Sequence, residues 1–396
     1  MNENPEMCLC RFFGLVFYIG RTIGVSPVIW KHEEGTCVYR KSMYSLTWSF
    51  VLIILLVLKL GTYTEFEALT AVHALPILLN GVTDLLYYLY LMVMILNINW
   101  RATQWEKLLN NMNRVSRNDG LLCETALRTG RKVTYTFVAT VFLIVISNCA
   151  ILAYLQFSDS YETKFSFQFI GGKVMQNGVL MFYVYVFSYT SAFIGILTCF
   201  EKVSLAALKY KKIEPMEKIT PSDNQQEIFF GFTYTVCASE HIPSPEISEL
   251  TKAEVLEYFR ILHERISELI NGFNGCMNPL LLVHVVIEII VIVINWYSVI
   301  IKIAYDFTEP ETQTIFVLNL VFAISHTIGL FVFLRNGQKL SNMVQGYIGF
   351  LTEYSTRVST EEEYIQVRIF IEKIEEHRQF SASGIFPIDL GIAGPV

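Results

Sequence analysis

Six long apolar stretches constrain this chain more than any other feature of its sequence. Each is 21 to 27 residues long, and a helix that crosses a bilayer needs about 20 mostly apolar residues. One such stretch could be a buried helix of a soluble protein, but six argue against that reading. Apolar residues make up 53% of the chain and charged residues 17%, compared with about 25% charged in ordinary globular domains. The sequence predicts an all-α, polytopic transmembrane helical bundle with spans at Met43–Tyr63, Ala74–Ile98, Val133–Gln156, Asn177–Phe200, Pro279–Tyr305 and Gln313–Leu334.

The basic residues predict how this bundle is oriented in the bilayer. Lys and Arg accumulate in the cytoplasmic connections of membrane proteins. Here 26 of the 30 basic residues lie before the first span, after the sixth, or in the second-to-third and fourth-to-fifth connections. We therefore expect a multi-pass protein of the plasma membrane with a cytoplasmic N-terminus. This orientation is the reverse of that of a G-protein-coupled receptor.

Two amphipathic segments outside the spans predict a helical base under the membrane. Apolar residues recur every three or four positions in Ile247–Ile270, within a helix expected at about 246–278, and in Glu361–Phe380. These helices are expected to pack between subunits or as a hairpin within one chain. Phe12–Trp30 is predicted to be an interfacial helix followed by a turn. The expected organisation is an N-terminal cytoplasmic segment at 1–42, the six-span bundle at 43–334, a cytoplasmic helical segment at 335–380 and the start of a further helix at 381–396.

The sequence argues against several classes of function. A net charge of −6 without a basic tract does not suit a nucleic-acid-binding protein. His263-Glu264 lacks the second histidine of a zinc-binding helix, and Gly171-Gly172-Lys173 lacks the longer phosphate-binding pattern. We therefore expect no catalytic residues, no metal site, no cofactor and no enzymatic activity.

Polar residues within the spans are the better candidates for function, because ionisable groups are costly at membrane depth. Asp84 lies in the middle of the second span and Glu288 in the middle of the fifth, with His284 and His326 in the fifth and sixth. Either a ligand or mutual hydrogen bonding would explain the two carboxylates. Amide and aromatic side chains in the outward halves suit an uncharged ligand, although aromatic residues also belt the membrane interface. The predicted ligand-binding residues are Asp84, Tyr154, Tyr183, Glu288, Asn295, Trp296 and Tyr297.

Two short motifs resemble those of the insect gustatory receptors. The phrase from Phe380 to Leu390, Phe-Ser-Ala-Ser-Gly-Ile-Phe-Pro-Ile-Asp-Leu, is similar to the segment that leads into their last helix. The phrase from Arg21 to Pro27 is similar to their N-terminal Gly-x-x-Pro element. The resemblance implies a ligand-gated, non-selective cation channel for small tastants such as sugars or bitter compounds. It also implies a homo- or hetero-tetramer of related subunits, with a pore lined by the seventh helix and a ligand pocket in the outer half of each subunit.

The C-terminal region departs from this family pattern. The Thr-Tyr-x-x-x-x-x-Gln-Phe motif of the seventh helix is absent, and the 16 residues after Phe380 are too few to span a bilayer. We therefore expect a chain truncated at the start of that helix, which inserts and keeps its pocket but does not conduct alone. A secondary transporter of small polar solutes is the alternative, although no repeat relates the first three spans to the next three.

Overall fold

The computed structural model describes seven helical segments and three short hairpins. The described residues are 18, 21, 26, 28–33, 36–61, 74–118, 135, 139, 146, 190, 193–209, 225–229, 232–236, 251–304, 310–376, 381–382 and 386–387. Apart from three single residues, the predicted third span, Val133–Gln156, lies outside the described residues, as does most of the fourth.

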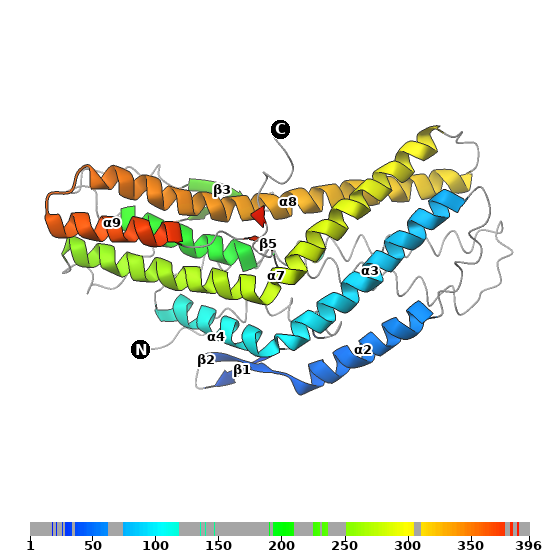
Figure 1. Cartoon of the computed structure of the whole chain (residues 1–396), viewed down its shortest axis with the longest axis horizontal. Helices are drawn as coiled ribbons and strands as arrows, with labels where there is room; N and C mark the ends of the chain where they lie inside the picture. The colour runs from blue at the N-terminus through cyan, green and yellow to red at the C-terminus, as the bar shows by residue number, and fades with distance from the viewer. Residues whose placement is uncertain are drawn as a thin grey trace.

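Long helices dominate the architecture (Figure 1). Helix α7 is at the centre and packs against α8, α3, α9 and α4. Helices α2 and α3 start at the residues where the first two apolar stretches begin. The helices are α2 (Met43–Gly61), α3 (Ala74–Trp100), α4 (Ala102–Asn118), the helical residues 193–209, α7 (Lys252–Ala304), α8 (Pro310–Ser355) and α9 (Glu361–Glu376).

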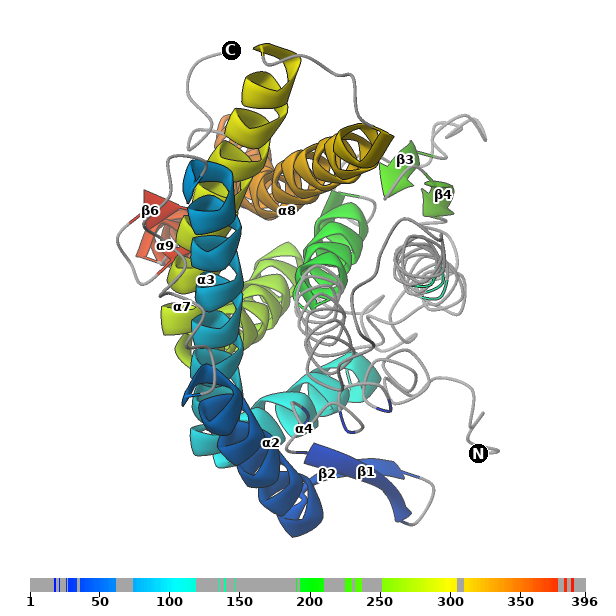
Figure 2. The same cartoon turned by 90° about the vertical axis from the view of Figure 1, so that its right-hand side faces the viewer.

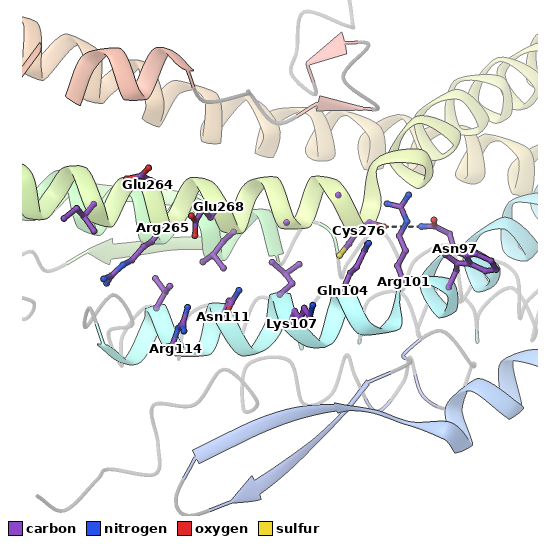
Figure 3. A pocket seen from close by; sticks show the side chains of 17 residues that line it. Asn97, Arg101, Gln104, Lys107, Asn111, Arg114, Glu264, Arg265, Glu268 and Cys276 are labelled. Atoms are coloured by element: carbon purple, nitrogen blue, oxygen red, sulfur yellow. Dashed lines mark hydrogen bonds between the residues drawn. The ribbon is translucent and has the colours of Figure 1, made fainter. Parts of the chain in front are cut away.

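Helix α7 joins the predicted basal helix and the predicted fifth span into 53 continuous residues. It bends midway (Figure 1), just after Cys276 in Figure 3. Pro279 follows three residues later and has no backbone N–H, so it cannot complete the helical hydrogen bond of that turn. The bend separates a basal half that carries charged residues from an apolar half.

Helix α8 likewise continues past the predicted end of the sixth span, Leu334, and reaches Ser355. Helix α9 then turns back and packs against both α7 and α8. The two amphipathic segments therefore meet within a single chain. Together with residues 193–209 and α4 they form a helical base, whose core includes Phe193 stacked on Phe273 at 4.2 Å between ring centroids.

The hairpin of β1 (Val28–Glu33) and β2 (Thr36–Lys41) corrects the prediction of a turn after an interfacial helix. The strands pair antiparallel, with Trp30 opposite Tyr39. Tyr39 also exchanges two 2.9 Å hydrogen bonds with the side chain of Asn110 in α4. Figure 2 shows the hairpin beside α4. The available signal was a pair of short apolar runs, Val28–Trp30 and Cys37–Tyr39, on either side of Glu34-Gly35.

Two further hairpins were not predicted. Strands β3 (Gln225–Phe229) and β4 (Phe232–Val236) pair in the fourth-to-fifth connection. Strands β5 (Ser381–Ala382) and β6 (Phe386–Pro387) pair where a helix was expected to start. Pro387 cannot donate the backbone hydrogen bond that an interior helical position requires, which favours the extended conformation.

One helical segment in the described ranges, Leu280–Ile301, is long and apolar enough by itself to cross a membrane. Met43–Leu55 and Tyr88–Trp100 are shorter apolar segments of α2 and α3. The apolar halves of α7 and α8 expose many aliphatic side chains, such as Val293, Ile300 and Ile328. An exposed aliphatic surface of this kind suits contact with lipid.

Candidate functional site

The best candidate site lies where the apolar half of α7 meets α8. Glu288 is fully buried, and its Oε1 is 3.1 Å from Nδ1 of His326. Gly329 faces the same carboxylate, since a Cβ atom at this position would lie 3.9 Å from Oε1. Among the described residues, the second oxygen of Glu288, Oε2, has no hydrogen-bond partner. A buried acceptor of this kind is costly unless something bonds to it.

A second polar pair lies one turn away and connects α7 with α3. The hydroxyl of Tyr90 is 2.8 Å from Nδ1 of His284, and both side chains are buried. Phe333 of α8 presents its ring to His284 in an edge-on contact with 5.5 Å between centroids. His284 and Glu288 are four residues apart, so they share one face of α7. We call the four side chains Tyr90, His284, Glu288 and His326 the polar cluster.

Trp296 lies two helical turns beyond Glu288 in the same helix pair. Its Nε1 donates a 3.1 Å hydrogen bond to Oγ1 of Thr327, the residue that follows His326. The indole is 37% exposed, so part of its ring is available for contact. A part-exposed aromatic ring is a suitable contact surface for the apolar part of a small ligand.

The structure shows no hydrogen bond between the other predicted site residues and the polar cluster in the part of the chain that it describes. Asn295 donates to the backbone oxygen of Val291 in its own helix at 2.9 Å. Tyr297 is 42% exposed, and nine residues from Glu288 put it on the opposite side of α7. Asp84 belongs to α3, but its side chain is outside the described part. Tyr154 and Tyr183 are outside the described residues altogether.

Sequence reasoning noted the two histidines as buried polar groups but did not assign them to the site, and it missed Tyr90. The spacing of His284 and Glu288 was a usable signal, because residues four apart share a helix face. Tyr90 had no such signal: it is 194 residues from His284 in the chain. It also lies within an apolar run with several other tyrosines.

The helical base holds a separate buried polar group. Glu201 and His263 are almost fully buried, with 3.1 Å between Oε2 and Nδ1. The hydroxyl of Tyr347 donates to the backbone oxygen of Glu201 at 3.0 Å. Burial and the nearby Glu201 carboxylate raise the pKa of Tyr347 well above its ordinary value, so the hydroxyl stays a donor. This group links residues 193–209, α7 and α8, which is a structural role.

No cluster of three or more metal-ligating side chains occurs in the described ranges. His263 is bonded to Glu201 and lies 3.4 Å from Oγ of Ser267. Both polar groups form hydrogen bonds between helices.

Comparison with known proteins identifies the family. The model of the 7tm chemosensory receptor family matches residues 13–393. The chain belongs to this family. Its helical bundle is that of a transmembrane receptor, and chemosensory receptors of the family are multi-pass membrane proteins. Leu280–Ile301 of α7 is a described segment whose length and composition suit a membrane span of this receptor.

Two solved structures share this receptor's fold. Both are of the insect olfactory receptor OR5 from Machilis hrabei, one of them in complex with eugenol, and each is 12% identical in sequence to this chain. Each comparison covers 97% of this chain and 94% of the OR5 chain, with TM-scores of 0.63 for OR5 and 0.59 for the eugenol complex. None of the curated proteins matches the chain.

Proposed function

We propose that this chemosensory receptor is a gustatory receptor, a ligand-gated, non-selective cation channel subunit for small tastants. The observation that carries the proposal is the buried Glu288 carboxylate, which bonds His326 through one oxygen and has no described partner at the other. A ligand hydroxyl would satisfy that acceptor. The fold similarity to OR5, which was solved with eugenol, supports a small-molecule ligand.

The chemistry of the site favours an uncharged compound that carries hydroxyl groups. A buried carboxylate accepts hydrogen bonds strongly, while the part-exposed Trp296 ring offers a face for a sugar ring or an aromatic bitter compound. Glu288 and Trp296 are the two residues on which the pocket depends. Asp84, Tyr154, Tyr183, Asn295 and Tyr297 remain predictions for the same pocket.

We further propose a cytoplasmic N-terminus and a tetramer of identical or related subunits. The distribution of basic residues supports the orientation. The helical base formed by α4, α9, residues 193–209 and the basal halves of α7 and α8 supports the assembly, because it presents a preformed surface beneath the membrane. In this arrangement ligand binding at the α7–α8 contact would move helices that extend without interruption into the base.

Ligand binding to the purified chain tests the proposal without requiring a pore. Thermal unfolding in detergent would be followed with sucrose, fructose, caffeine or quinine added. We expect at least one of these to raise the unfolding temperature in a saturable way, since a ligand that binds the folded state stabilises it by mass action. The absence of any saturable shift from all four would contradict a tastant site.

Current recordings test the channel assignment. In excised patches without nucleotides, the compound that binds should evoke a cation current in cells expressing the receptor, alone or with a second family member. A secondary transporter is the second candidate, because a buried Glu–His pair within membrane helices also suits proton-coupled transport. Saturable uptake of the compound without current would favour the transporter.

A further inference from the structure

A groove with a volume of about 1090 Å³ lies between α4 and the basal half of α7. It is lined by Arg101, which lies between α3 and α4, by Lys107 and Arg114 of α4, and by Arg265 of α7. Figure 3 shows Arg265 reaching from α7 toward α4, and Arg101 directed at the bend of α7. We refer to this space as the basal groove. It is separate from the polar cluster of the membrane half.

The positive charge of the basal groove is largely uncompensated. In the described part of the chain, Arg101, Lys107 and Arg114 form no ion pair with a carboxylate. Of the two acidic residues at the groove, Glu264 pairs with Arg260 at 3.3 Å, and its carboxylate lies on the side of α7 away from α4 (Figure 3). Glu268 is the second acidic residue at the groove. The three basic side chains without an ion pair, together with the pairing of Glu264 to Arg260, leave the groove with positive charge that favours an anion.

The groove opens at the edge of the membrane. Its upper end is formed by Asn97 and Trp100 of α3 and by Gly275 and Cys276 of α7. The apolar segment of α3 ends at Trp100, and that of α7 starts at Leu280. Trp100 is 91% exposed, and exposed Trp beside Arg is typical of the interface between lipid and water.

The groove is also preformed. The side-chain amide of Asn97 donates to the backbone oxygen of Cys276 at 3.2 Å and ties α3 to α7 at the groove's upper end. Burial raises the pKa of the Cys276 thiol to about 12, so the thiol is neutral and does not cancel the charge of Arg101. A Cβ atom at Gly275 would have no neighbour within 4 Å, which shows open space at the mouth.

We propose that the basal groove binds the phosphate-bearing headgroup of an anionic membrane lipid. Guanidinium groups bind phosphate through paired hydrogen bonds, and basic pockets between membrane helices are suited to phosphorylated headgroups. The exposed Trp100 at the upper end of the groove favours a lipid over a second copy of the chain, because exposed Trp is typical of the lipid–water interface. The inference goes beyond the proposed tastant site and uses only the placement of α3 and α7 in the membrane.

The test measures binding of a fluorescent phosphatidylinositol 4,5-bisphosphate to the full chain in neutral detergent. Two variants remove the site: Arg101→Gln with Arg114→Gln removes charge, and Gly275→Leu fills the mouth. Gly349→Leu is the matched control, because a Cβ at this position of α8 also has no neighbour within 4 Å and lies outside the groove. Arg357→Gln controls for the loss of one exposed charge.

We expect both site variants to weaken binding by at least about tenfold, and both controls to bind as wild type does. Unlabelled phosphatidylinositol 4,5-bisphosphate should compete strongly, phosphatidylcholine hardly, and soluble inositol 1,4,5-trisphosphate less well than the lipid.

Equal affinity of Gly275→Leu and wild type would overturn the proposal. Equal competition by the soluble trisphosphate would assign the groove to a free phosphate compound instead. If Gly275→Leu altered the oligomeric state in size-exclusion chromatography but left lipid affinity unchanged, the groove would be a contact between copies.

Discussion

Oε1 of Glu288 and Nδ1 of His326 lie 3.1 Å apart across the contact of α7 with α8, and both side chains are buried. The pair joins two helices that each continue into the base, over 53 and 46 residues. A change in one hydrogen bond at this contact can therefore be transmitted to the base by rigid helices. This relationship motivates the first prediction.

His326→Ala should destabilise the folded receptor by about 3 kcal/mol, because it leaves a buried carboxylate without its partner. The double variant Glu288→Leu with His326→Leu should cost less than His326→Ala alone, since both polar groups are then removed together. Thermal unfolding in detergent measures both. A double variant that costs as much as the sum of the single changes would show that the two residues are not coupled.

Trp296→Ala should weaken tastant binding by about tenfold, because the ligand loses an aromatic contact face. Trp296→Phe should have a smaller effect, since it keeps a ring and loses only the bond from Nε1 to Thr327. Binding is measured by the ligand-dependent shift in unfolding temperature. Trp100→Phe is the control, since this exposed indole is at the other end of the membrane half; an equal loss from that change would exclude a specific role for Trp296.

Glu201→Ala should destabilise the base by about 3 kcal/mol, because His263 is then buried without its carboxylate partner. Glu201→Gln should cost less, since an amide can still bond to the imidazole. Glu353→Gln removes a carboxylate from an exposed pair with Arg357 and should change stability by at most about 0.5 kcal/mol. The prediction fails if all three variants unfold at the same temperature.

The N-terminus of α7 should become less stable at acidic pH. Thr251 donates from its backbone N–H to Oε2 of Glu254 at 2.8 Å, and this bond lowers the pKa of Glu254 below its ordinary value of 4.5. A carboxylate whose pKa is lowered by folding stabilises the folded state at pH values above its unfolded pKa. This stabilisation is lost as the pH falls through the lowered pKa of the folded state. The protection of the first-turn amides of α7 against hydrogen exchange, taken relative to the intrinsic rate at each pH, should fall below about pH 4.5. In Glu254→Gln this protection should not change over this range.

The long apolar stretches were sufficient to predict the helical membrane bundle, because hydrophobicity over 20 residues is a local property. They do not show where the apolar part of α7 or α8 ends and its basal part begins. The apolar and amphipathic halves share the same helical period, so no boundary separates them in the pattern. Pro279 marks the change with a bend, and the helix continues on both sides of it.

The candidate site was predictable in part. Glu288 and Trp296 were identified from depth and chemistry alone, and the structure brings both to the α7–α8 contact. Tyr90 joins the polar cluster only because α3 packs against α7. No local sequence pattern predicts that packing, since Tyr90 and His284 are 194 residues apart. The basal groove was not predicted either, because its basic residues come from two separate helices and served only as evidence of orientation.

We expect the contact of Glu288 with His326 to belong to the tastant site. The most direct test compares tastant affinity in Glu288→Gln and Glu363→Gln, since Glu363 is a buried glutamate of α9 in the base that bonds Tyr354. Affinity is taken from the saturable shift in unfolding temperature produced by the compound that binds wild type. Glu288→Gln should bind it at least about tenfold more weakly, because a neutral amide replaces the carboxylate acceptor, and Glu363→Gln should bind as wild type does. Equal affinities in the two variants would contradict the account.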